Sequence, residues 1–217
     1  MKNTIFPEVP VVTQTPDTQA KITPAEAIKM LKQGNARFKE GNPIPRDLHA
    51  QIEQTATGQF PFAAIVSCID SRIPTEMIFD QGIGDIFNAR IAGNFVNPDI
   101  LGSLEFACKL AGSKVVVVMG HTSCGAVKGA CDEAKLGNLT QMLDKIMPAV
   151  NAIKTPEGVD RSSANTPFVD KVAAKNVELA IKNIKVQSPV LNKMYQNGEI
   201  DIIGAMYDVN TGRVKFL

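Results

Sequence analysis

Two cysteines and a histidine stand where the sequence could bind a metal ion. Cys68 ends an apolar run at 62–68, and His121 and Cys124 follow a second apolar run at 114–120. Thiolate and imidazole are ligands that Zn²⁺ prefers in tetrahedral sites. Three protein ligands leave the fourth position open, which distinguishes a catalytic zinc ion from a structural one. The pattern predicts one zinc ion per chain with chemistry at the metal.

Two charged residues beside Cys68 extend this prediction. Asp70 could either ligate zinc or stand beside a zinc-bound water, and Arg72 could hold the Asp70 carboxylate in a bidentate pair that keeps it ionised and off the metal. Zinc lowers the pKa of its bound water, so zinc-bound hydroxide is the expected nucleophile, with Asp70 as its hydrogen-bond acceptor. Taken singly, each cysteine is more commonly a small buried core residue. The combination CxDxR and HxxC, in a chain with two histidines, favours the metal site.

The remaining cysteines and histidine fit other roles. Cys108 and Cys131 lie in apolar helical patterns and are predicted to be core thiols, while His49 has no cysteine nearby and is predicted at a surface or interface. Four unevenly spaced cysteines do not make the disulfide framework of a small secreted domain.

Alternating strands and helices must position the ligands. β-branched and apolar runs predict strands, and 3.6-residue periodicity predicts helices. This predicts an α/β fold with a mainly parallel β-sheet flanked by helices, in which ligand sites gather at the carboxyl ends of strands. Strands are expected at 62–68, 85–91, 114–120, 200–209 and 213–217, and helices at 75–79, 101–110, 124–135, 138–153 and 164–186.

An N-terminal helical arm is expected ahead of this core. Thr23 and Glu26 form a capping box that predicts a helix through Phe38, and a weaker helical pattern covers 48–55. The first 20 residues are rich in proline and threonine and predict an extended lead. The chain is therefore interpreted as an arm at 1–58 and a zinc-binding core at 59–217, a single domain overall.

Composition excludes several classes of partner. Apolar residues make up 44%, charged residues 21%, and the formal net charge is +1, so neither nucleic acid nor an anionic membrane is expected to bind. No apolar run approaches the roughly 20 residues of a membrane span. A soluble protein is predicted, cytoplasmic as the sequence stands and periplasmic if an export signal preceded residue 1.

Three sequence blocks resemble the signatures of β-class carbonic anhydrases: CIDSR at 68–72, ARIAGN at 89–94 and GHTSCGAVKGA at 120–130. The resemblance covers about 23–217. It implies reversible hydration of carbon dioxide to bicarbonate, a catalytic dyad of Asp70 and Arg72, and a closed state in which Asp70 becomes the fourth zinc ligand. It also implies a homodimer or a higher homo-oligomer, with the arm helix packed on a second subunit.

The resemblance further implies which residues contact substrate. Gln59 matches a hydrogen-bond donor to substrate, Phe87 and Ala92 match the small apolar pocket, and Gly125 matches a glycine beside the site. Phe106 stands where a tyrosine is common, so the aromatic wall is kept and its hydroxyl lost. Carbon dioxide carries no charge, so a narrow apolar pocket with few donors suits it.

A regulatory site is expected to be incomplete. Members that bind a non-catalytic bicarbonate use a tryptophan, an arginine and a tyrosine; Arg90 and Tyr207 match, but Ile65 stands at the tryptophan position. No strong bicarbonate-driven switch is therefore expected. Two alternative functions stay open: a carbon disulfide or carbonyl sulfide hydrolase on the same fold, and a non-catalytic protein whose structural zinc is closed by Asp70.

Overall fold

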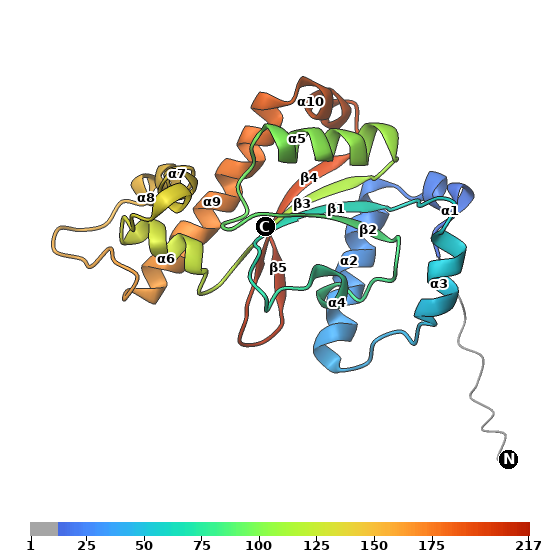
Figure 1. Cartoon of the computed structure of the whole chain (residues 1–217), viewed down its shortest axis with the longest axis horizontal. Coiled ribbons are helices and arrows are strands. Elements are labelled where there is room, and N and C mark those ends of the chain that lie inside the picture. The colour runs from blue at the N-terminus through green and yellow to red at the C-terminus, as the bar shows by residue number, and fades with distance from the viewer. Residues whose placement is uncertain (1–12) are drawn as a thin grey trace, which may run out of the picture.

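A five-stranded sheet crosses the centre of the molecule (Figure 1). The computed structural model describes residues 13–217. The sheet order is β2-β1-β3-β4-β5; the first four strands are parallel, and β5 runs antiparallel to β4. The strands are β1 (Ala63–Ser67), β2 (Ile86–Arg90), β3 (Val115–His121), β4 (Asp201–Tyr207) and β5 (Val214–Phe216). The predicted mainly parallel sheet and its closing strand pair are confirmed.

The two central strands are apolar on both faces. Every residue of β1 and β3 is buried. Alternate side chains face opposite ways, so Ile65 and Val117 join one hydrophobic cluster while Ala64 and Val116 join the other. A parallel sheet covered on both faces needs such continuous apolar runs.

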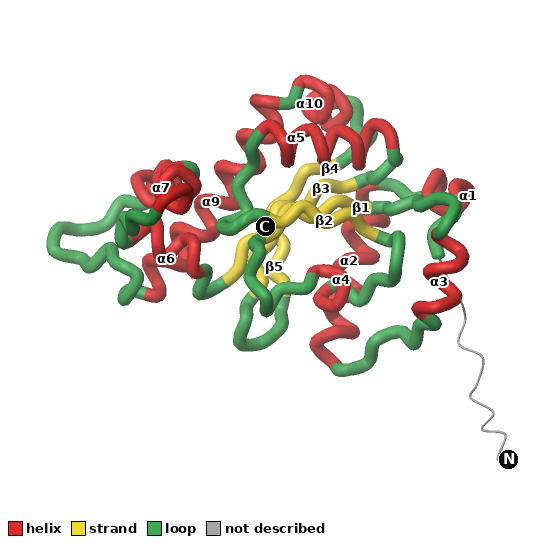
Figure 2. The backbone as a smooth tube through the Cα atoms, viewed as in Figure 1, coloured by secondary structure: helices red, strands yellow, loops and turns green. Residues whose placement is uncertain are grey.

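Helices cover both faces of the sheet (Figures 1 and 2). Helix α2 packs into the first cluster, α5 and α10 pack into the second, and α9 contributes to both. None of the helices within residues 13–217 is long and apolar enough to cross a membrane. The helices are α1 (Pro16–Lys21), α2 (Pro24–Glu40), α3 (Leu48–Thr55), α4 (Thr75–Ile78), α5 (Pro98–Glu105), the π-helical turn η1 (Phe106–Leu110), α6 (Gly125–Cys131), α7 (Gly137–Asp144), α8 (Met147–Ala152), α9 (Thr166–Gln187) and α10 (Pro189–Gln196).

The N-terminal lead differs from its prediction. Residues 1–12 lie outside the described part, but α1 is a helix, capped by Thr15, so the expected extended conformation is wrong there. Its Gln19 is buried and donates to the carbonyls of Pro61 and Ala111, both at 2.8 Å. The hydrogen-bond partners of α1 are thus distant in sequence, and a local sequence pattern cannot show such contacts. The division into arm and core remains a prediction.

Two further helix predictions need correction. The helix expected at 138–153 is two helices, α7 and α8, because Pro148 has no N–H to donate and its ring would clash with the carbonyl of Asp144 in a continuous helix. Helix α10 is an additional element that the hydrophobic pattern does not predict; Ser188 caps its start, accepting from the Leu191 N–H at 3.2 Å.

A buried carboxylate ties α2 and the loop after it to the core. Asp80 is 4% exposed and has φ of +46°. The Arg37 Nε lies 2.5 Å from its carboxylate, Arg46 pairs with the other carboxylate oxygen and with the Asp80 carbonyl, and the Ile44 N–H donates at 3.2 Å. Burial opposes ionisation, but these donors outweigh it and hold the pKa of Asp80 below its usual range.

We expect Asp80→Asn to lower the free energy of unfolding by about 2 kcal/mol at pH 7, since hydrogen bonds to charged groups contribute about 1.5–3 kcal/mol. Asparagine tolerates the positive φ, so the change removes the charge and one acceptor oxygen without adding backbone strain. Because the folded pKa is depressed, the contribution is present above the unfolded pKa of about 3.9 and is lost as pH falls through the folded pKa. Urea unfolding at pH 7 and at a pH below the folded pKa of Asp80 measures the difference in free energy of unfolding. Glu53→Gln, at an exposed carboxylate on α3, is the control; an equal loss in both variants would contradict the assignment.

Candidate metal centre

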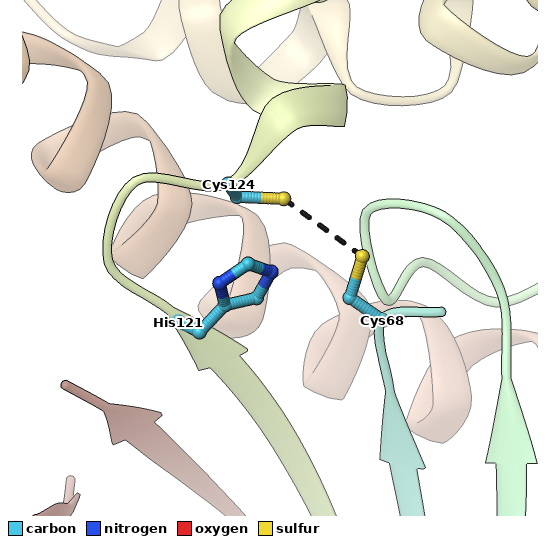
Figure 3. Close-up of side chains that lie close together, drawn as sticks. All are labelled: Cys68, His121 and Cys124. Atoms are coloured by element: carbon cyan, nitrogen blue, oxygen red, sulfur yellow. Dashed lines mark hydrogen bonds between the residues drawn. The ribbon is translucent and has the colours of Figure 1, made fainter. Parts of the chain in front are cut away.

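The three predicted ligands meet at the carboxyl ends of β1 and β3. Cys68 directly follows β1, His121 is the last residue of β3, and Cys124 immediately precedes α6. In the β1–β3 register Ser67 lies opposite Met119, so the residues just beyond them emerge at the same edge of the sheet. Figure 3 shows the three side chains pointing toward one another.

Their geometry suits a small metal ion. The ligand atoms of Cys68, His121 and Cys124 all lie within 4.8 Å of one another, and the two sulfurs are 4.0 Å apart. All three residues are buried. Across residues 13–217 this is the one group of three or more His, Cys, Asp or Glu residues that could hold a metal ion.

The His121 ring presents a lone pair to the centre of this group. Its Nδ1 lies 3.0 Å from the Thr122 carbonyl oxygen, which can only accept, so Nδ1 carries the proton. The opposite nitrogen, Nε2, is then unprotonated, and it is buried with no hydrogen-bond partner among the described residues. A metal-ligating histidine is commonly oriented in this way, and a bound cation would satisfy the orphaned Nε2.

The surroundings favour a thiolate at Cys68. The Cys124 thiol at 4.0 Å and the Gly93 N–H at 3.3 Å both hydrogen bond to the Cys68 sulfur, and they hold the pKa of Cys68 far below the usual range despite burial. The hydrogen bond that the Cys124 thiol donates to that thiolate raises the pKa of Cys124, and burial and the repulsion between two adjacent anions raise it further. A cation between the sulfurs would remove the repulsion and allow both to ionise.

Asp70 lies beside the ligands and is held by Arg72. Its carboxylate accepts from the Arg72 Nε at 2.9 Å, from Nη2 at 2.7 Å and from the backbone N–H at 3.0 Å. The Arg72 guanidinium lowers the pKa of Asp70 to about 2. The Asp70 Oδ2 is also 3.9 Å from the His121 Nε2, so an ionised acceptor faces the ligand group.

Longer-range contacts fix the loops that carry the ligands. Arg90 donates to the carbonyls of Cys68 at 2.9 Å and Asp70 at 2.6 Å. Ser123, with φ of +55°, donates its backbone N–H to the Asp170 carboxylate at 3.0 Å. Sequence reasoning did not identify a positioning role for Asp170, because no local pattern shows that α9 passes beside the ligand loop.

Comparisons with known proteins agree with this site. The carbonic anhydrase family model matches residues 63–214, more than half of the chain. A solved structure from a study of two tetrameric β-carbonic anhydrases of Sordaria macrospora superposes with a TM-score of 0.65 and 25% identity, covering 78% of this chain and 90% of that one. The chain belongs to the β-class carbonic anhydrase family.

Other members of the family support the assignment. Carbonic anhydrase 2 of Mycobacterium tuberculosis is 33% identical over 196 residues, covering 88% of this chain and 91% of that protein. A β-carbonic anhydrase of Aspergillus fumigatus superposes with a TM-score of 0.67 and 26% identity over 89% of each chain. The similarity therefore spans most of the chain, beyond the ligand loops.

The substrate-binding residues expected from the family are dispersed in a single chain. Phe87 and Phe106 contact edge to face, with ring centroids 6.1 Å apart, and line a hollow of about 630 Å³ between β2 and α5. Gln59 is exposed four residues before β1, at the strand end opposite Cys68. A five-residue strand spans roughly 17 Å, so Gln59 is remote from its own chain's ligands.

The other predicted pocket residues lie near the ligand loops. Ala92 is half-buried beside Gly93, whose N–H contacts Cys68. Gly125 is exposed at the start of α6, and an added Cβ would meet open space. The structure thus places these two residues next to segments that carry the ligands.

The residues outside the site take their expected environments. Cys108 is buried, and burial raises its pKa to about 12, while Cys131 is partly buried against the first cluster. His49 is exposed. Ile65 is fully buried in β1 and Tyr207 is 5% exposed at the end of β4.

Proposed function

We propose that this chain catalyses the reversible hydration of carbon dioxide to bicarbonate with one Zn²⁺ held by Cys68, His121 and Cys124. The observation that carries the proposal is the convergence of two sulfurs and an unpartnered imidazole nitrogen beside an ionised carboxylate. This donor set matches the preference of zinc for tetrahedral nitrogen and sulfur coordination. Three ligands leave room for a reacting water.

Asp70 and Arg72 orient that water. When bound, zinc supplies a Lewis acid that makes water a nucleophile near neutral pH. The Asp70 carboxylate accepts one hydrogen bond from the water and so turns a lone pair toward carbon dioxide. Arg72 donates to both carboxylate oxygens, which keeps Asp70 ionised and opposes its entry into the ligand group.

A closed state in which Asp70 becomes a fourth ligand is part of the proposal. The Asp70 Oδ2 already lies 3.9 Å from the His121 Nε2. Entering the ligand group requires Asp70 to give up its contacts with Arg72, so the strength of that pair sets the balance between the two states. Ile65 offers no hydrogen-bond donor for an effector beside β1, so bicarbonate is not expected to drive the closure.

Stopped-flow hydration of carbon dioxide, combined with metal analysis, tests the proposed function. We expect about one zinc per chain. A chelator should abolish the hydration activity, and added zinc should restore it. Carbon disulfide and carbonyl sulfide are assayed in parallel. Hydrolysis of either without carbon dioxide hydration would favour the sulfur-substrate alternative, and stoichiometric zinc with no activity would favour a structural site.

We expect hydration activity to rise with pH through a midpoint near or above neutrality. The water must lose a proton to react, and two anionic thiolates leave the metal less electrophilic than neutral imidazoles would. Asp70, with a pKa of about 2, stays ionised across this range and does not set the rise. The pH profile of kcat measures the midpoint. Activity independent of pH between about 6 and 9 would contradict this assignment.

We also propose that the active assembly is a homodimer or a larger homo-oligomer. Gln59 cannot reach the ligands of its own chain, so its expected substrate contact requires a second copy. The arm and α4 expose large apolar side chains, namely Ile44, Leu48, Ile52 and Met77, each between 47% and 63% exposed. Light scattering coupled to gel filtration measures the mass; a monomer with full activity would contradict the proposal.

A further inference from the structure

Asn176 is a buried polar residue in the middle of α9 that the proposed reaction leaves unexplained. It is 3% exposed, and its side-chain amide donates to the Gly93 carbonyl at 2.6 Å. Asparagine is a weak helix former, and a buried amide is costly without hydrogen bonds. That hydrogen bond joins α9 to the loop between β2 and α5.

Gly93 is the residue that connects this contact to the metal site. Its N–H donates to the Cys68 sulfur at 3.3 Å while its carbonyl accepts from Asn176. Its φ is +82°, and an added Cβ would lie 2.4 Å from the Ile146 Cδ1 and 3.4 Å from the Ala126 Cβ. Gly93 is therefore enclosed by neighbours and held through both of its backbone polar groups.

We propose that Asn176 is a positioning residue of the metal site, which acts through Gly93 to keep the backbone N–H directed at the Cys68 sulfur. The inference rests on the proposed role of Cys68 as a ligand. An N–H donor withdraws electron density from a thiolate, and contacts outside the ligand set fix ligand orientation and tune the metal. Loss of Asn176 leaves the Gly93 carbonyl unpaired and frees the loop to turn the N–H away.

Cobalt(II)-substituted protein gives a readout besides activity. Thiolate-to-cobalt charge-transfer absorption reports directly on the sulfur electrons. A hydrogen bond lowers the energy of those electrons, so in Asn176→Leu we expect the band to move to longer wavelength. Transfer of zinc to a chelator should also become about 10-fold faster, since loss of such outer contacts commonly costs 10–100-fold in metal affinity or activity.

Asn35 supplies a matched control. It is 4% exposed on α2, and its amide donates to the carbonyls of Ile78 at 3.1 Å and Gly212 at 2.9 Å, away from the ligand loops. Asn35→Leu removes the same type of buried contact. We expect it to lower the melting temperature while the charge-transfer band and the zinc-transfer rate stay at wild-type values.

The outcomes separate this inference from the proposed function. Wild-type protein without thiolate-to-cobalt absorption would refute the ligand set itself. A normal wild-type band that Asn176→Leu leaves unchanged, or that Asn35→Leu shifts equally, would overturn the positioning role. If the leucine variant does not fold, Asn176→Ser is used, because serine is too short to reach the Gly93 carbonyl and smaller than the side chain it replaces; the same shift is expected.

Discussion

Cys124→Ser is expected to lose both the metal and the hydration activity. The Cys124 sulfur is one of three converging ligand atoms and lies 4.0 Å from the Cys68 sulfur. A serine hydroxyl does not ionise near neutral pH and cannot replace a thiolate as a zinc ligand. We expect zinc to fall from about one per chain toward zero, with activity at background. Metal analysis after gel filtration and stopped-flow hydration measure the two losses.

Cys131→Ser is the matched control for this change. Burial raises the pKa of Cys131 to about 11, so its thiol stays protonated at neutral pH. It lies at the end of α6, away from the ligand group. We expect wild-type zinc content and activity. A Cys124→Ser variant that kept stoichiometric zinc and full activity would show that the ligand set is wrong.

Asp70→Asn is expected to keep zinc and lose hydration activity by at least about 100-fold, within the range that a positioned acid or base contributes. The amide carries no charge to pair with Arg72, and its NH₂ group cannot accept a hydrogen bond from the water. The three proposed ligands are unchanged, so we expect the zinc content to stay at the wild-type value while the hydration rate falls. Zinc analysis and kcat/KM on one preparation give both values.

Asp144→Asn, at an exposed carboxylate ending α7, controls for loss of one negative charge and should match wild type. Wild-type turnover in Asp70→Asn would refute the assignment of Asp70 and Arg72 as a catalytic dyad and would leave Asp70 with a structural role. Loss of zinc in Asp70→Asn would instead mean that Asp70 helps to hold the metal in the resting protein.

The two variants test different parts of one arrangement. In the function that we propose, Cys124 belongs to the donor set that holds the metal, whereas Asp70 acts on the water that the metal activates. Arg72 affects both, because its hydrogen bonds to Asp70 keep that carboxylate ionised as an acceptor and also oppose its entry into the ligand group. Asp70 and Arg72 should therefore act as a unit, and the effects on the hydration rate of changing the two residues should not add.

The sequence by itself predicts the candidate metal ligands and the strands that carry them. Cys68, His121 and Cys124 were predicted from residue type and from their position after apolar runs, and the structure brings them together. This succeeded because side-chain chemistry and hydrophobic periodicity are local properties. A buried parallel strand must be apolar on both faces, and its carboxyl end must meet that of its neighbour.

Only the tertiary structure decided what supports the site from a distance. The contacts of Asp170 with Ser123 and of Asn176 with Gly93 cross 47 and 83 residues of sequence. The buried position of Gln19 and the separation of Gln59 from its own chain's ligands are likewise set by how the elements pack. Such contacts depend on which surfaces meet after folding, and a hydrogen bond between distant segments leaves no periodicity in either one. Residue chemistry thus determined what the site could do, and packing decided which side chains hold it in place.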